Sequence, residues 1–265
     1  MTALDRCTLS ITVGHKRPNF EVRSHSKHLC QIGRLPTDLI VKPPALAHLS
    51  DAHLSEYYML FGLANYLREN NQKYTHLSIA HYRRFVAVIK SGVASTNQAY
   101  TRIIPPEMAN DVYANHRIPP SGDWLIGYPL QLNEGGVVRQ FARHHPLSEL
   151  LRILVASADE KVLSNEFIAE ILNQNLFIPA PSASFTPVDC FLSTMDILER
   201  AVRAYLKSTH LREFEGYQKR IIAFCLERIH SHLTLSMLAK TPTNRVTVGY
   251  QYVVGYGDTV IASGR

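Results

Sequence analysis

The chain alternates between short apolar runs typical of strands and longer stretches with helical periodicity. Residues 7–15 alternate as a strand, and residues 73–85 form a second strand-like run. Between them, residues 52–70 repeat apolar side chains at near-helical spacing, behind a cap at Ser50 or Asp51. A strand, a helix and a second strand in this order predict a layered α/β domain.

The rest of the chain divides into a mixed middle part and a helical end. The predicted elements are a helical piece followed by a loop-rich stretch over 88–122, strands over 123–132 and 175–180, a helical segment after Gly135 and Gly136, and two long amphipathic helices over 185–240. We expect residues 1–240 to form a single domain. Residues 241–265 are Gly-rich and β-prone, and we expect a tail of unknown role there.

Composition narrows the class of protein. The 265 residues are 46% hydrophobic, enough for one sizeable core, and the net charge of +6 favours anionic ligands. Positive residues form no run of five or six, which disfavours a nucleic-acid-binding arm. The four cysteines are far apart without a CxxC motif, as in reduced cytosolic proteins. No stretch is long enough for a signal peptide or a membrane span, so we expect a cytoplasmic protein, with peripheral contact to the inner membrane as an option.

The stretch HLSIAHYRRFVAVI, residues 76–89, places charged side chains at the end of an apolar strand. Ligands of open α/β sheets bind at the carboxyl ends of strands. His15 and Lys16 follow the first strand in the same way, and Asp123 begins another strand. We expect these groups to converge on one crevice, where the guanidinium groups of Arg83 and Arg84 would suit a diphosphate. The alternative is that both arginines pair with carboxylates at the surface.

A second constellation lies in the last predicted helix. Arg220 and Glu227 are seven residues apart, which is two turns on one helix face, and Arg228 follows directly. Such a pair is more often a salt bridge between helices than a catalytic dyad, and both interpretations stay open.

These motifs occur together in a known order. ITVGHKRPNF, CQIG, LSEYYMLFGLANYL and YTHLSIAHYRRFV are followed by NLFI at 175–178 and YQKRIIAFCLERI at 217–229. The series resembles a bacterial domain-of-unknown-function family found in capsule, exopolysaccharide and O-antigen gene clusters. The resemblance covers roughly residues 8–235. The chain departs from it in a helix without Trp, in Phe141 where the family has Tyr, and in the tail after residue 240.

The resemblance implies a glycosyltransferase that uses nucleotide-activated sugars and has the Rossmann-like fold called GT-A. Ordinary members of that fold hold a divalent metal with a DxD motif after a strand. Here the matching strand ends in HYRR, and no DxD occurs in the chain. Two guanidinium groups can neutralise a departing diphosphate as a metal would, so we expect metal-independent catalysis without a cofactor, with a divalent metal as the alternative.

The resemblance also implies roles for individual residues. The expected donor-binding residues are His15, Lys16, His81, Tyr82, Arg83, Arg84 and Arg220. The candidates for the carboxylate that accepts the acceptor proton are Asp123, Asp189 and Glu56. The expected structural residues are His145, Asn175, Tyr217, Glu227 and Arg228. No metal ligand is assigned.

The implied substrates are a nucleotide-sugar donor, a UDP-sugar first, and a hydroxyl of a glycan or lipid-linked acceptor in surface polysaccharide synthesis. Galactofuranose or another hexose would be transferred. Two other classes of function remain open. A nucleic-acid-binding or nucleic-acid-glycosylating protein would fit the pI of about 9.1. A non-catalytic partner in a polysaccharide assembly complex would fit the missing Trp residues.

Overall fold

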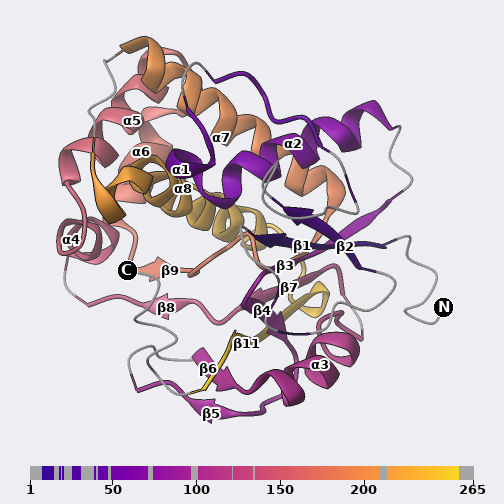
Figure 1. Ribbon diagram of the computed structural model, residues 1–265. Coiled ribbons are helices and arrows are strands. Elements are labelled where there is room, and N and C mark those ends of the chain that lie inside the picture. Colours follow the sequence, from indigo (N-terminus) through magenta and orange to yellow (C-terminus); the bar gives the residue numbers. More distant parts are fainter. Residues whose placement is uncertain are drawn as a thin grey trace.

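The computed structural model describes most of the chain. The described residues are 8–14, 18, 20, 26–30, 39, 41–46, 49–70, 74–96, 101–120, 122–133, 135–208 and 214–256. Within them, one mixed sheet lies between helices on both faces (Figure 1). The predicted α/β fold class is therefore confirmed.

The central sheet has nine strands among the described residues. They are β1 (Thr8–Gly14), β2 (Ser26–Cys30), β3 (His76–His81), β4 (Arg84–Ala87), β5 (Val93–Ala94), β6 (Thr101–Ile104), β7 (Trp124–Gly127), β10 (Phe185–Pro187) and β11 (Val246–Val254). Their order is β2-β1-β3-β10-β7-β11-β6-β5, and β4 pairs with both β3 and β11. A separate two-stranded ribbon joins β8 (Leu130–Gln131) to β9 (Leu176–Phe177).

Six of the nine strands run in the same direction. β1 is parallel to β2 and β3, while β11 is parallel to β6 and β7. β10 is antiparallel to both β3 and β7, so these two also share one direction. The carboxyl ends of β1, β3, β6, β7 and β11 therefore meet at one edge of the sheet, which we call the carboxyl edge.

Helices cover the two faces of the sheet unequally. They are α1 (Asp51–Leu54), α2 (Glu56–Glu69), α3 (Pro106–Asn115), α4 (Gly136–Ala142), α5 (Leu147–Asp159), α6 (Asn165–Asn173), α7 (Val188–Ser208) and α8 (Ile221–Leu238), with the short 3-10 helices η2 (Gly216–Arg220) and η3 (Thr243–Arg245). In Figure 1, α1, α2 and α5–α8 lie above the sheet and α3 lies below it.

The alternation of side chains along the strands explains this packing. Leu9, Ile11 and Val13 of β1 point to the upper face with Leu77 and Ile79 of β3, into the core formed with α2, α5, α7 and α8. The alternate positions point to α3. The hydroxyls of Thr12 and Tyr113 lie 2.8 Å apart on that face, and Ala80 packs there too. The larger core therefore lies between the sheet and α2, α5, α7 and α8, and the smaller one lies between the sheet and α3.

Three sequence predictions about the elements need correction. The stretch expected to be loop-rich contains β6 and α3, because Pro106 can start a helix at its first turn. The expected tail contains β11, a nine-residue strand inside the central sheet, so the domain does not end at residue 240. Arg220 ends a 3-10 helix rather than lying in α8, so it does not share a regular helix face with Glu227.

Candidate functional site

The HYRR motif is a tight hairpin turn rather than the interior of one strand. β3 ends at His81, which pairs with Arg84 at the start of β4. The amide of Tyr82 donates to the carbonyl of Val13 over 2.8 Å, and the amide of Val254 donates to the carbonyl of Arg83 over 2.9 Å. The turn is therefore fixed to the ends of β1 and β11. The motif lies at the carboxyl edge, as the sequence predicts.

Strand geometry orients the motif toward the helices. His81 points to the same face as Leu77 and Ile79, because side chains alternate along β3. Arg84 lies directly opposite His81 on the neighbouring strand, so the two side chains share that face. Nε2 of His81 lies 3.0 Å from the hydroxyl of Ser182, in the loop that leads into β10. This contact spans 101 residues and fixes the imidazole.

Glu56 faces the histidine from the helical side. It is the first residue of α2, where the positive end of the helix favours a carboxylate. Burial raises the pKa of this carboxyl, but the charge of His81, a hydrogen bond from the Ser55 side chain, its own backbone amide and Arg220 together hold the pKa below its ordinary value. Glu56 is therefore ionised at neutral pH.

His81 and Arg84 carry the opposite electrostatic pattern. Burial lowers the pKa of His81, Glu56 and Glu227 oppose this, and Arg84 and Arg83 add to it, so the net direction is downward. Burial and the charge of Arg83 also lower the pKa of Arg84. An arginine remains charged after any such shift. The turn thus presents two positive charges beside the imidazole of His81 and the carboxylate of Glu56.

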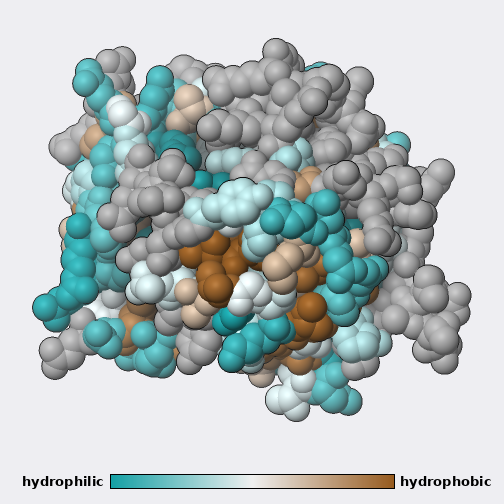
Figure 2. Space-filling view, turned by 60° about the horizontal axis from the view of Figure 1, so that its bottom comes forward, coloured by the Kyte–Doolittle hydropathy of each residue, from teal (hydrophilic) through white to brown (hydrophobic). Residues whose placement is uncertain are grey.

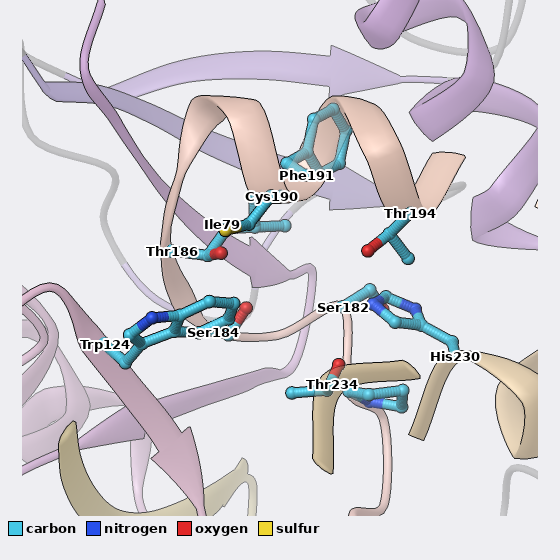
Figure 3. A pocket seen from close by; sticks show the side chains of 11 residues that line it. Ile79, Trp124, Ser182, Ser184, Thr186, Cys190, Phe191, Thr194, His230 and Thr234 are labelled. Carbon is cyan, nitrogen blue, oxygen red and sulfur yellow. The ribbon is translucent and has the colours of Figure 1, made fainter. Parts of the chain in front are cut away.

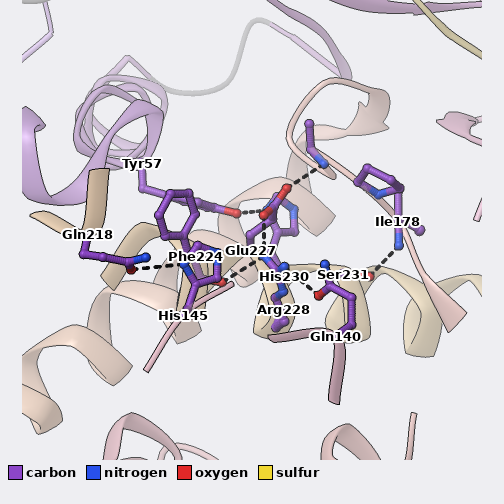
Figure 4. A network of polar contacts seen from close by, with 12 residues as sticks. Tyr57, Gln140, His145, Ile178, Gln218, Phe224, Glu227, Arg228, His230 and Ser231 are labelled. Atoms are coloured by element: carbon purple, nitrogen blue, oxygen red, sulfur yellow. Dashed lines mark hydrogen bonds and ion pairs between the residues drawn. The ribbon is translucent and has the colours of Figure 1, made fainter. Parts of the chain in front are cut away.

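α8 supplies a second carboxylate, Glu227. Its Oε1 accepts a hydrogen bond of 2.9 Å from the amide of Ala180, and its Oε2 accepts one of 2.6 Å from Arg228. Arg228 is buried and also donates to Oε1 of Gln140 over 2.8 Å. Figure 4 shows these contacts converging beneath the loop before β10. Glu227 and Arg228 therefore brace the loop that carries Ser182.

Tyr57 and His230 lie beneath the two carboxylates. Both side chains are buried, and the Tyr57 hydroxyl shares a hydrogen bond of 3.2 Å with Nδ1 of His230 (Figure 4). Burial lowers the pKa of His230 to about 3, against the opposing charge of Glu56. Burial and Glu56 raise the pKa of Tyr57 well above its ordinary value. Both groups are neutral at physiological pH.

An aromatic stack supports the start of α8. The His145 ring lies 4.1 Å from the ring of Phe224, and its Nδ1 lies 3.1 Å from Oε1 of Gln218. The Arg220 guanidinium lies 5.0 Å from the centre of the Tyr217 ring. Arg220 also acts electrostatically on Glu56, so η2 forms a wall of the same site.

A small cavity opens behind Ser182, between β3, β10, α7 and α8 (Figure 3). Its lining includes the hydroxyls of Ser182, Ser184, Thr186, Thr194 and Thr234, with His230 on one wall. Apolar side chains of Ile79, Trp124 and Phe191 complete the lining, so the cavity is mixed in character. The cavity lies next to the site, because two of its lining residues contact site residues: Ser182 contacts His81, and His230 contacts Tyr57.

Two of the three predicted proton acceptors lie elsewhere. Asp123 precedes β7, so it lies at the opposite, amino edge, where it pairs with Arg245 and approaches Nε2 of His76 at 3.6 Å. Asp189 is exposed in the first turn of α7, beyond the end of β10 that pairs with His76. The expectation that Asp123 joins the HYRR crevice is wrong, because a residue before a parallel strand lies at the edge opposite its carboxyl end.

The remaining predicted residues have different outcomes. His15 and Lys16 lie outside the described residues. Asn175 lies just before β9 and uses its backbone, since its carbonyl accepts a hydrogen bond of 2.7 Å from Leu132. Within the described ranges, no group of three or more His, Cys, Asp or Glu side chains could hold a metal ion. Nor does any helix there combine the length and apolar character needed to cross a membrane.

The face of the molecule around α3 and β5 differs from the site. Figure 2 shows brown apolar patches on this side, interrupted by polar side chains. The exposed apolar residues of these elements are Val93 in β5 and Met108 in α3. None of the HYRR contacts described above involves them.

Five residues that complete the site carry no direct signal in the sequence. They are Ser55, Tyr57, Ala180, Ser182 and His230. Ser182 lies in a Pro- and Ser-rich loop, whose composition indicates only a turn. His230 follows Glu227 by three residues on α8, so helical spacing alone could have placed it on the same face.

The fold and the site together define a class of protein: an α/β domain with a mixed central sheet and charged groups at the carboxyl edge of that sheet. The bifunctional glycosyltransferase WbbM, solved in its apo form, superposes with a TM-score of 0.72 at 12% sequence identity. The match covers 94% of this chain and 46% of that chain, so this chain spans about half of WbbM. No protein-family model and no curated protein matches the sequence. At this identity the likeness shows the fold alone.

Proposed function

We propose that the protein transfers a sugar from a nucleotide-diphosphate donor to an acceptor hydroxyl, with the reaction centred on the HYRR turn. The observation that carries the proposal is the meeting of Arg83, Arg84 and His81 with the carboxylate of Glu56 at the carboxyl edge. The glycosyltransferase fold supports it, because ligands of such sheets bind at this edge.

The two arginines would stabilise the leaving group. When the bond between the sugar and the diphosphate breaks, its electron pair stays on the diphosphate oxygen. The hairpin holds the backbone of Arg83 and Arg84, so their guanidinium groups would meet that charge from a turn that is already formed. They would also repel a divalent cation, which supports metal-independent catalysis. We expect full activity in excess EDTA; loss of activity that Mn²⁺ or Mg²⁺ restores would contradict this step.

Glu56 would accept the proton of the acceptor hydroxyl in an inverting reaction. The acceptor oxygen forms its bond to the sugar carbon while the carboxylate takes the proton. Among the three carboxylates considered, only Glu56 lies beside His81, and its low pKa keeps it ready to accept a proton. His81, held by Ser182, would orient the phosphate or the sugar.

The sequence motifs support a particular substrate class. The resemblance to polysaccharide-cluster proteins favours a UDP-sugar donor, a hexose such as galactofuranose, and a glycan or lipid-linked acceptor at the inner face of a bacterial membrane. In that setting the reaction would extend a capsule, exopolysaccharide or O-antigen.

Thermal-shift titration tests the proposal, because a ligand that binds the folded state raises the melting temperature. The panel comprises UDP-, GDP- and dTDP-sugars, with CMP-sugars as monophosphate controls. We expect one diphosphate class to raise the melting temperature and to release its nucleoside diphosphate when acceptor is added. A panel without any shift would contradict donor binding, and a shift without turnover would indicate a non-catalytic partner. Salt-dependent duplex binding without any such shift would favour a nucleic-acid function.

A further inference from the structure

Strained backbone is concentrated at the candidate site. Among the described residues, three other than glycine have a positive φ: Ser55 at 51°, Lys161 at 53° and Ala180 at 44°. Ser55 directly precedes Glu56, and Ala180 donates its amide to Glu227. Lys161 instead follows the end of α5, where its amide donates to Ala158. Glu56 and Glu227 are therefore both held by a residue whose positive φ costs free energy, because that conformation is sterically unfavourable for any residue with a side chain.

Ser55 is the more extreme case. Its ψ of −133° lies outside the left-handed helical region that Asn, Asp and Gly commonly visit. The residue ends α1 and begins α2, and its amide bonds to the carbonyl of Asp51 over 2.8 Å. Leu54 and Tyr57 on either side are fully buried, so packing holds the bend in place. Strain that persists under such packing points to a functional constraint.

The Ser55 side chain does not cap α2, although Ser55 directly precedes this helix. A serine before a helix usually accepts a hydrogen bond from an amide of the first turn. Ser55 makes no such bond to α2, and its side chain instead helps to lower the pKa of the neighbouring Glu56 carboxyl. The bend also makes Glu56 the first residue of α2, beside His81.

We propose that Ser55 is a positioning residue, whose bent backbone and hydroxyl together aim the Glu56 carboxylate at the HYRR turn. This role rests on the proposed function, because it assigns the strain to the carboxylate that takes the acceptor proton. Ala180 holds Glu227 in a related way through its backbone amide.

Three variants separate the parts of this role. Ser55→Ala removes the hydroxyl and keeps the strain. Ser55→Gly removes both, because glycine adopts positive φ without a steric penalty. Lys161→Gly is the matched control, since it relieves a positive φ away from the site. The measurements are the thermal midpoint, the pKa of Glu56 from ¹³C NMR of its carboxyl without any substrate, and kcat and KM for transfer.

Both Ser55 variants should raise the pKa of Glu56 and lower kcat by about tenfold or more, with the donor KM unchanged. Ser55→Gly should melt about 2 °C or more above Ser55→Ala. Lys161→Gly should leave the pKa and kcat as in the wild type. An unchanged Glu56 pKa in Ser55→Ala, or equal melting of the two Ser55 variants, would overturn the role. If the pKa and melting respond but the wild type transfers no sugar, the positioning stands and the proposed reaction fails.

Discussion

Acid should destabilise the protein through His230, which is buried and neutral in the fold. The pKa of His230 is about 3 in the folded protein, whereas it has its ordinary value of about 6.5 in the unfolded chain. The unfolded state therefore binds a proton that the folded state excludes. The stability that depends on neutral His230 is complete above pH 6.5 and is lost as the pH falls toward 3. At pH 5, about 1.5 pH units below the ordinary value, the loss is about 2 kcal/mol.

Urea unfolding at pH 8 and pH 5 measures this loss, with His230→Gln as the comparison. Glutamine does not titrate and can still share a hydrogen bond with Tyr57. Other titrating groups, among them His145 with a pKa of about 4, are present in both proteins and cancel in the comparison. We expect the wild type to lose about 2 kcal/mol more than the variant between the two pH values. Equal losses would refute the claim that His230 is buried in its neutral form.

Three substitutions test the assignment of the site. Glu56→Gln should lower kcat by about a hundredfold or more in steady-state kinetics, with the donor-induced thermal shift retained; a fully active variant would exclude Glu56 as the proton acceptor. Arg83→Ala should lower turnover by at least about tenfold, because a lost charged contact is worth about 1.5–3 kcal/mol, and unchanged turnover in the folded variant would remove this assignment. Asp123→Asn should lower the melting temperature by weakening the ion pair with Arg245, without changing turnover; a large fall in kcat would contradict its place at the opposite edge.

The sequence predicted the elements whose patterns are local and strong. β1 alternates clearly and α7 repeats its apolar residues over 21 residues, so the predicted bounds of both lie near the observed ones. The strand predicted over 73–85 is present, but it ends at His81. The local sequence predicts a tail where β11 lies, because the pairing of this strand is remote. It joins β6, β7 and β4, which lie more than 100 residues earlier in the chain. No local pattern states where such a strand inserts.

The part of the site that has a local sequence pattern could also be predicted. HYRR stood out because charge interrupts an apolar strand, and its place at a strand end followed from sheet geometry. Asp123 was misplaced although the same geometry applies to it, since it precedes its strand and so belongs to the amino edge. The contact from Ser182 to His81 and the bend at Ser55 could not be predicted, because packing of distant segments determines both.

We propose that the HYRR turn binds the diphosphate of a nucleotide donor. Calorimetric titration of UDP into the wild type, Arg83→Ala and Arg245→Ala tests it most directly. Arg245 is the matched control, since it lies at the opposite edge of the same sheet with Asp123. We expect Arg83→Ala to weaken UDP binding by about tenfold or more and Arg245→Ala to leave it unchanged. Equal weakening by both variants, or binding that ignores Arg83, would contradict the account.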